Sequence, residues 1–405
     1  MFLGLVAMMD PPHREVPDAI KKCRRAGVRV MMITGDHPLT ALAVARKIGL
    51  APETIPTEPG HFVPVIEGAH IDTFSDDQLR QLLTPTAPGE PDPIFARMAP
   101  RHKMRIVSAL KEMREVVAVT GDGVNDAPAL KTADIGIAMG IAGTDVAKET
   151  ASMILLDDNF ATIVHAIEEG RAVYTNIRKF VTYVLASNVP EIVPYLGFGL
   201  SSMPLALTIP QILAVDLGTD MVPALALAAE PPEGGVMDDP PRPRTERLLS
   251  WDVILRAYAF LGLIEAGIAM GGFFLYLYSQ GWSWAAPLDW TSPLYKEATT
   301  VTFAGIVAAQ VANVFACRSD RVSAFRLGWF SNPLILVGVA VELTILLVMT
   351  YSPVGHLVLG TASLPAWIFG PLALGAIGLL LADELQKFVR RRMGARLSLQ
   401  PDRGT

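Results

Sequence analysis

The chain has 405 residues, of which 51% are hydrophobic, a formal net charge of −6 and a mean hydropathy of +0.37. So apolar a composition excludes an ordinary soluble globular protein. The two cysteines, Cys23 and Cys317, lie far apart in the sequence, which excludes a disulfide framework.

The hydrophobic residues are distributed unevenly along the chain. Charges are frequent in residues 1–170, whereas residues 180–383 contain several apolar runs. These runs approach the length of about 20 residues that spans a bilayer core. The sequence therefore predicts a soluble N-terminal part followed by a membrane part.

The apolar run at residues 1–9 fits either a signal peptide or a buried strand. It lacks a basic N-terminal region and a small-residue cleavage site, and Asp10 and two prolines end it abruptly. We therefore predict a buried strand.

Short apolar segments then alternate with helical patterns. The expected strands and helices lie at residues 28–33, 38–48, 100–113, 116–120 and 135–139. Asp36 is expected to cap the first of these helices. Residues 51–93, rich in Pro, Gly, Thr and acids, are predicted to be loop with one short helix near Ser75–Leu83. The alternation predicts an α/β domain with a parallel, doubly wound sheet.

Residues 120–130 read TGDGVNDAPAL and directly follow the apolar run at residues 116–119. Asp122 then lies at the carboxyl end of a strand, between two glycines that permit a tight turn. Asp126 and Pro128 suit a helix start. A carboxylate beside a helix N-terminus suits a Mg²⁺-phosphate group. The alternative is a simple turn between a strand and a helix that binds no ligand. Such a turn would account for any two of these residues but not for all eleven.

An amphipathic helical pattern capped by Asn159 continues into the apolar region. We therefore expect a soluble part over residues 1–158, a connecting helix over 159–179, membrane helices over 180–383 and a basic tail over 384–405.

Six membrane spans are expected. They lie at about residues 180–200, 206–229, 253–279, 299–317, 333–351 and 365–383. Arginines and lysines gather after the second, fourth and sixth spans, whereas the opposite loops hold only Lys296. The positive-inside rule then predicts a multi-pass protein of the cell membrane with both termini and the soluble part in the cytoplasm.

Polar residues gather in the first two predicted spans. Asn188 and Glu191 share a helical face near two prolines, and Asp216, Thr219 and Asp220 share a face of the second span. Three unpaired acids would cost about 8–10 kcal/mol in a bilayer, and neither span contains Lys or Arg. A bound cation or protons would compensate, and oxygen ligands suit Ca²⁺, Na⁺ or K⁺. The alternative is a protonated cluster that only packs helices.

Polar residues of the later spans include Gln310, Asn313, Glu342 and Glu265. Gln310 and Asn313 share a face of the fourth span and either extend the cluster or make plain interhelical hydrogen bonds. Glu342, alone in the fifth span, is an ambiguous candidate for a ligand or a proton site. Glu265 in the third span is expected to be protonated or to adjust toward lipid rather than to function.

Together these motifs resemble the type II P-type cation-transporting ATPases, which include calcium pumps and sodium/potassium pumps. The resemblance covers nearly the whole chain. It rests on Asp10-Pro11-Pro12, Thr34-Gly35-Asp36, Phe95-Ala96-Arg97 with Lys103, Thr120 to Leu130, Asp157 to Phe160, Ser187 to Glu191, and Asp216 to Asp220. It implies part of a haloacid-dehalogenase-like, Rossmann-like phosphorylation domain, a stalk helix and an all-α bundle of six transmembrane helices.

The resemblance also implies the roles of single residues. Asp122 would bind Mg²⁺ with Asp126 beside it, and Lys103 would neutralise the phosphoryl group as a point charge. The residues implied to contact ATP or its phosphoryl group are Thr34, Gly35, Asp36, Arg97 and Asn125. The residues implied to coordinate the transported cation are Asn188, Glu191, Asp216, Thr219 and Asp220, with Gln310 and Glu342 as further candidates.

The sequence departs from the family in one large respect. The family's phosphorylated aspartate lies in an Asp-Lys-Thr-Gly-Thr segment, which this sequence does not contain. The actuator loop, the nucleotide-binding domain and the first four spans also have no counterpart. Because phosphoryl transfer needs a nucleophile, the leading hypothesis is the C-terminal half of a pump that requires an N-terminal half. In the family fold the absent strand is central, so two strand edges would remain open.

Two other functions compete with a half-pump. A catalytically inactive membrane protein would bind a cation or modulate a full-length pump. A membrane-tethered phosphatase is disfavoured by the absent nucleophile. The second-span motif looks closer to sodium/potassium pumps, but we favour Ca²⁺ because such bacterial pumps are commonly assigned to it. We expect no nucleic-acid partner.

Overall fold

The computed structural model describes residues 11–52, 64–85, 91–284 and 286–397. The strand predicted at residues 1–9 lies outside this range. The chain forms two compact units. The first contains residues 1–170 and 233–243, and the second contains residues 171–232 and 244–405.

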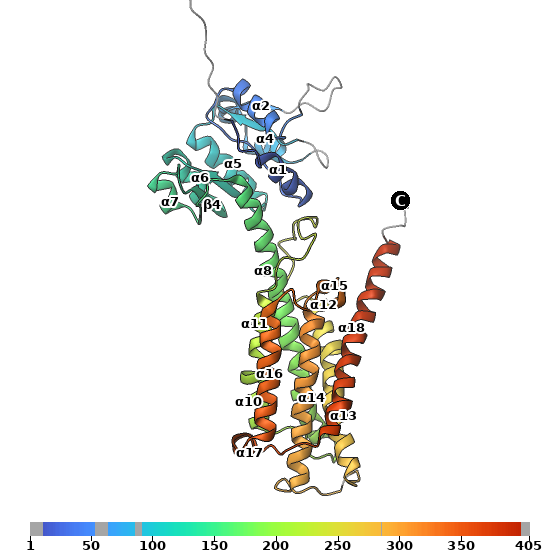
Figure 1. The fold of residues 1–405 in the computed structure, drawn as a ribbon. Coiled ribbons are helices and arrows are strands. Elements are labelled where there is room, and N and C mark those ends of the chain that lie inside the picture. Colours follow the sequence, from blue (N-terminus) through green and yellow to red (C-terminus); the bar gives the residue numbers. More distant parts are fainter. Residues whose placement is uncertain (1–10, 53–63, 86–90, 285, 398–405) are drawn as a thin grey trace, which may run out of the picture. The chain divides into compact units, whose positions relative to one another are not determined.

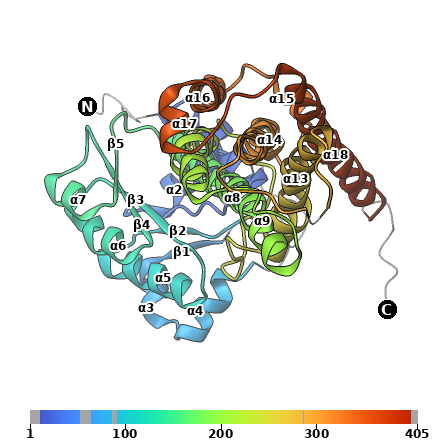
Figure 2. The same cartoon turned by 90° about the horizontal axis from the view of Figure 1, so that it is seen from below.

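The first unit contains two small parallel sheets (Figures 1 and 2). In one sheet β1 (Val65–Glu67) pairs with β2 (Ile94–Ala96). In the other, β4 (Ile135–Met139) lies between β3 (Ala118–Gly121) and β5 (Met153–Leu155). Parallel strands are confirmed, but the expectation of one sheet is wrong for the described residues. The pair β1 and β2 and the group of β3, β4 and β5 remain separate sheets, because no described strand forms backbone hydrogen bonds with both.

The segment at residues 28–33 contributes one bridge, between Ile33 and Phe95, instead of a full strand. Backbone bonds from Phe95 N to Met32 O and from Thr34 N to Phe95 O surround that bridge. Consecutive ladder pairs define a strand, and this segment makes too few of them. The predicted loop at residues 51–93 also holds β1 and a short helix that the pattern did not predict.

Helices accompany both sheets. They are α1 (Val16–Arg25), α2 (Pro38–Lys47), α3 (Gly68–Thr73), α4 (Asp76–Leu83), α5 (Pro100–Glu112), the 3₁₀ turn η1 (Val124–Asp126), α6 (Ala127–Thr132) and α7 (Asp145–Thr150). Phe95, Leu79 and Ile106 are buried in one cluster, which joins β2 to α4 and α5. Burial of such side chains stabilises the unit.

Local sequence signals account for the helix ends. Ser75 and Gln78 form the reciprocal capping box of α4. Asn159 accepts a hydrogen bond from Ala161 N at the start of α8 (Phe160–Ser187), as predicted. The cap of α2 is His37, whose Nδ1 accepts from Leu39 N, so the prediction of Asp36 as cap is wrong. Asp36 precedes the helix by one residue too many to reach its first free amides.

The second unit is helical. It contains the end of α8 and α9 (Val189–Leu200), α10 (Ile209–Ala214), the π-helix η2 (Val215–Thr219), α11 (Met221–Ala228), α12 (Trp251–Ile254), the π-helix η3 (Leu255–Gly262), α13 (Leu263–Ser279), α14 (Pro293–Cys317), α15 (Ala324–Leu327), α16 (Pro333–Tyr351), α17 (Pro353–Val358), the 3₁₀ turn η4 (Ala366–Ile368) and α18 (Phe369–Leu397).

Five continuous helical stretches of the described residues are long and apolar enough to cross a membrane. They are Ile209–Ala228, Trp251–Ser279, Pro293–Cys317, Pro333–Tyr351 and Ala366–Arg392. They correspond to five of the six predicted spans. The remaining prediction, residues 180–200, is divided at Asn188 between α8 and α9. Pro190 has no amide proton to donate one turn back, which interrupts the helical bonding there.

The helix α14 forms the centre of the second unit. Most of its side chains are buried, and α13, α16 and α18 pack around it (Figure 2). Gly305 packs so closely against the backbone of Ala269 that an added Cβ at residue 305 would lie 2.9 Å from Ala269 Cα. Such close approach of two helices requires a residue without a side chain.

The last helix does not end at residue 384, where the predicted last span gives way to the predicted basic tail. The helix α18 continues to Leu397, and Lys387 is buried. Lys387 belongs to the packed interior because acidic side chains surround it, as described below.

Candidate functional site

The glycine-rich turn after β3 brings a lysine and an aspartate together. Lys103 Nζ of α5 lies 2.6 Å from Asp126 Oδ1, and both side chains are largely buried. Gly123 N donates to Asp126 Oδ2 over 3.4 Å. A Cβ at Gly121 would lie 2.8 Å from Asp126 Cγ, so only glycine leaves room for this carboxylate. The ion pair of Lys103 with Asp126 was not predicted from the sequence, which assigned Lys103 to the phosphoryl group.

The other acid of the turn, Asp122, directly follows β3 and is exposed. Asn125, in η1, is also exposed. Among the described residues no three His, Cys, Asp or Glu side chains converge on a possible metal site. Two carboxylates beside a helix start nevertheless fit Mg²⁺, which usually takes one or two protein carboxylates together with phosphate oxygens and water.

A second loop gathers the residues expected to contact nucleotide or phosphate. Arg97 N donates to Asp36 O over 2.9 Å, and Met98 N donates to Thr34 O over 3.0 Å. Asp36 N donates to Thr34 Oγ1 over 3.1 Å. Thr34, Gly35, Asp36 and Arg97 therefore form one group where the extended segment and β2 end. Arg97 has φ +50°, a left-handed conformation that is uncommon for residues other than glycine.

Asp158 has a structural role that the sequence reasoning did not assign. Its carboxylate accepts backbone hydrogen bonds from Gly140, Ile141 and Ala142 over 2.6, 3.0 and 2.7 Å. These amides, Ile141 first, hold the pKa of Asp158 below its ordinary value of 3.8. Asp158 thereby fixes the loop after β4. Its place in the Asp157 to Phe160 motif was the available signal.

In the second unit, three predicted polar residues form a hydrogen-bonded chain between the second and fourth spans. Thr219 Oγ1 donates to Gln310 Oε1 over 3.0 Å, and Gln310 Nε2 donates to Asp220 Oδ1 over 2.7 Å. All three side chains are buried. Gln310 therefore makes the interhelical hydrogen bonds that were one of its two predicted roles, and a role as a cation ligand stays a prediction.

The π-helix η2 changes the predicted arrangement of the second span. Asp220 N donates to Val215 O five residues back, so an ideal α-helical face over residues 216–220 is not kept. Thr219 and Asp220 are buried, whereas Asp216 is half-buried. Asn188, at the break between α8 and α9, is also half-buried.

Three glutamates of the first, third and fifth predicted spans are also buried. They are Glu191, Glu265 and Glu342. Within the described part of the chain, neither carboxylate oxygen of Glu265 or Glu342 has a hydrogen-bond partner, and Oε1 of Glu191 has none. Glu265 is fully buried, so the expectation that it adjusts toward lipid is wrong. The packing of α13 against α14 and α9 encloses it.

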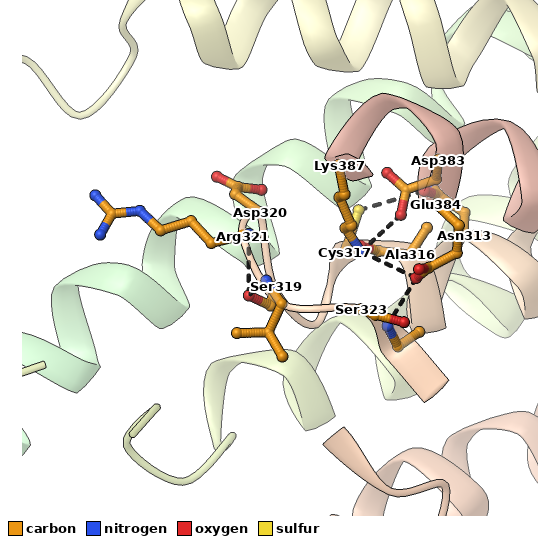
Figure 3. Close-up of polar contacts among 12 residues, drawn as sticks. Asn313, Ala316, Cys317, Ser319, Asp320, Arg321, Ser323, Asp383, Glu384 and Lys387 are labelled. Atoms are coloured by element: carbon orange, nitrogen blue, oxygen red, sulfur yellow. Dashed lines mark hydrogen bonds and ion pairs between the residues drawn. The ribbon is translucent and has the colours of Figure 1, made fainter. Parts of the chain in front are cut away.

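A buried charge cluster lies at the end of α14 (Figure 3). Lys387 Nζ is 2.6 Å from Asp383 Oδ2, and it donates to Ala316 O over 3.0 Å. Arg256 of η3 is 2.8 Å from Asp383 Oδ1 and 3.2 Å from Asp320 Oδ1. The cluster therefore links the third, fourth and sixth spans. Ala316 O, one of the last carbonyl oxygens of α14, accepts the hydrogen bond because it has no partner within its own helix.

A second buried ion pair lies among the loops that were predicted to be basic. Arg318 Nη2 is 2.6 Å from Glu230 Oε1, and Asn332 Nδ2 donates to Glu230 Oε2 over 2.7 Å. Arg318 is buried, so it does not face solvent as a loop residue would. Buried charges require such partners.

Sequence comparisons agree with this division of the chain. A family model described as "Cation transporting ATPase, C-terminus" matches residues 204–389. Two models of haloacid dehalogenase-like hydrolases match residues 1–134 and 104–167.

Similar curated proteins are sodium/potassium-transporting ATPases. The chain is 38% identical to the alpha subunit of Tetronarce californica and to the alpha-3 subunit of Homo sapiens, covering 96% of this chain and 42% of each relative. It is 39% identical to the alpha subunit of Drosophila melanogaster, covering 96% of this chain and 41% of that subunit. The chain thus spans about two fifths of the length of these relatives. It belongs to the type II P-type cation-transporting ATPases and corresponds to their C-terminal part.

Proposed function

We propose that this chain acts as the C-terminal half of an ATP-driven cation pump. The main support for this proposal is the pair of hydrogen bonds that connects Thr219, Gln310 and Asp220. It joins two membrane-spanning helices through oxygen-rich side chains in a buried place. Such a place in a membrane protein is where ion pathways occur.

In the first unit, Asp122 and Asp126 would hold Mg²⁺. The ion, when bound, offsets the charge on a transferring phosphoryl group. Lys103 adds a positive charge beside Asp126 and orients its carboxylate. The loop of Thr34, Gly35 and Asp36, with Arg97 and Asn125, would bind ATP or its phosphoryl group.

In the second unit, Asn188, Glu191, Asp216, Thr219 and Asp220 would coordinate the transported cation, together with Gln310 and Glu342. Carboxylate, amide and hydroxyl oxygens suit Na⁺, K⁺ and Ca²⁺ alike. The curated relatives are named as sodium/potassium pumps and do not support our expectation of Ca²⁺. We therefore assign Na⁺ or K⁺ first and keep Ca²⁺ as a comparison.

A partner chain would complete the first unit. Among the described strands β3 pairs only with β4, so its other edge is open. Val116, just before β3, is exposed. An open edge with apolar neighbours favours pairing with another strand. An N-terminal pump half would supply that strand, and a full-length pump is the alternative partner. Basic loops and both termini would face the cytoplasm of the cell membrane.

Phosphorylation tests this proposal. The purified chain in lipid nanodiscs is incubated with labelled ATP, Mg²⁺ and Na⁺, K⁺ or Ca²⁺, alone and with a co-expressed N-terminal half. We expect acid-stable phosphoenzyme only with both halves. Phosphoenzyme on this chain alone would refute the half-pump proposal.

The buried acids support one second candidate function, a catalytically inactive cation-binding or pump-modulating protein. In that case the chain would bind the cation and co-purify with a full-length pump, but it would form no phosphoenzyme with an N-terminal half.

A further inference from the structure

We propose that Glu265 is a direct ligand of the bound cation, contributed by the third span. This inference rests on the proposed cation-binding function and adds a helix to it. The ligand class is a hard cation held by oxygen atoms, with Na⁺ as the first probe. From the sequence alone, Glu265 was expected to have no function.

Glu265 is completely buried, and neither of its carboxylate oxygens has a hydrogen-bond partner among the residues that the structure describes. An acid in that state is costly unless a proton or a cation accompanies it. The other buried acids near the helix ends solve this problem differently. Asp383 lies beside Lys387 and Arg256, and Glu230 lies beside Arg318.

Close helix packing on both sides fixes the position of Glu265. Gly262, one turn earlier, packs against Val189, and an added Cβ would lie 2.9 Å from Ala186 O. Ala269, one turn later, packs against Gly305 of α14. Residues 262, 265 and 269 share one helical face. Glu265 therefore faces the junction of the first and fourth spans.

The levels of the candidate residues along the bundle agree with this placement. The hairpin of α13 and α14 runs antiparallel, so contact of Ala269 with Gly305 places Glu265 level with Ala309, next to Gln310. Ala186 and Val189, which pack against Gly262, lie on either side of Asn188. The first and third spans run in the same direction, so Glu265, one turn after Gly262, lies one turn beyond Ala186 and Val189, at the level of Glu191. Glu265 thus lies between the turn that carries Glu191 and the turn that carries Gln310, both candidate ligands.

The backbone beside Glu265 is irregular as well. The π-helix η3 ends at Gly262, three residues before it, as the π-helix η2 ends at Thr219, just before Asp220. Such π-helical turns occur frequently at functional sites, because they shift side chains out of the regular helical register. Glu265 and Asp220, both buried, therefore each lie within three residues of the end of a π-helix.

Binding of labelled Na⁺ to the purified chain in nanodiscs tests the proposal. The variant Glu265→Gln keeps the volume and removes the charge. We expect it to bind Na⁺ about tenfold or more weakly. The matched control is Asp252→Asn, since Asp252 lies on the same helical run and is exposed. We expect that variant to bind like the wild type.

The outcomes separate this proposal from the proposed function. If Glu191→Gln weakens Na⁺ binding and Glu265→Gln does not, Glu265 is not a ligand and the cation site stands. If the wild type binds none of Na⁺, K⁺ and Ca²⁺, the cation-binding function fails, and this inference fails with it.

A measurement on the wild type covers the case in which Glu265→Gln does not fold. Dicyclohexylcarbodiimide modifies carboxyl groups in apolar surroundings, and mass spectrometry quantifies the modified peptide. We expect Na⁺ to protect Glu265 from modification, while choline at equal concentration does not. Equal modification of Glu265 with Na⁺ and with choline would overturn the proposal.

Discussion

Lys387 and Asp383 form an ion pair one turn apart in α18, with 2.6 Å between Nζ and Oδ2 and neither side chain exposed. The pair is held against the C-terminus of α14, where Lys387 donates to Ala316 O (Figure 3). Arg256 donates to the same carbonyl oxygen. Because the fourth span also carries Gln310 and Asn313, this contact fixes the helix that presents them.

Replacing Lys387 should destabilise the second unit strongly. The variant Lys387→Met leaves Asp383 buried with only Arg256 as a partner, and removal of one member of a buried pair costs about 3–5 kcal/mol. Urea unfolding in detergent micelles measures the loss. Arg390→Gln, on the exposed face of the same helix, should change stability by less than about 0.5 kcal/mol. The double variant Lys387→Met with Asp383→Asn should recover part of the loss, and no recovery would contradict the pairing.

Gly121 is required by the carboxylate of Asp126. The variant Gly121→Ala would place Cβ against Asp126 and displace it from Lys103. We expect faster amide hydrogen exchange across residues 121–130. Gly170→Ala is the matched control, because an added Cβ there meets nothing within 4 Å. That control should stabilise α8 by up to about 1 kcal/mol, and similar exchange in both variants would contradict the assigned collision.

Asp158 should make the first unit sensitive to acid. The backbone amides, Ile141 first, hold its pKa below 3.8, so its stabilisation is present above that value and is lost as pH falls through the lower folded pKa. The variant Asp158→Asn tolerates the φ of +50° at this position. We expect it to melt at a lower temperature at neutral pH, with a difference that shrinks in acid. Glu149→Gln, an exposed control, should show no such trend.

Gln310 should couple the second and fourth spans. The variant Gln310→Leu leaves the buried carboxylate of Asp220 without its donor, and an unsatisfied buried group costs about 1–3 kcal/mol. Urea unfolding measures the effect, with exposed Gln280→Leu as the control. A loss in both variants of equal size would show that the hydrogen bond contributes nothing specific.

Several elements follow from local sequence alone. The span predicted at residues 333–351 coincides with α16, because Asn332 caps the helix and proline occupies its first position. The helix predicted at 100–113 ends one residue early in α5. The motif at 120–130 placed Asp126 in a candidate site, but its contact with Lys103 was not predicted, because Lys103 was expected to face the phosphoryl group.

Other features were invisible in the sequence for a physical reason. The short strand β1 has three residues, too few for a periodic pattern. The π-helical turns η2 and η3 likewise have no local sequence signal, whereas the break at Asn188 follows from Pro190.

The sequence by itself determined the family, the α/β part followed by membrane helices, and the residue types at the candidate sites, because these depend on composition and local spacing. Only the tertiary structure decided which charged side chains are buried. In the sequence, Lys387, Arg318 and Glu265 cannot be distinguished from residues that face solvent or lipid. Their burial results from packing against helices and loops that are distant in the chain. The tertiary structure also determined that the strands form two sheets, because strand pairing is a contact between segments far apart in the sequence.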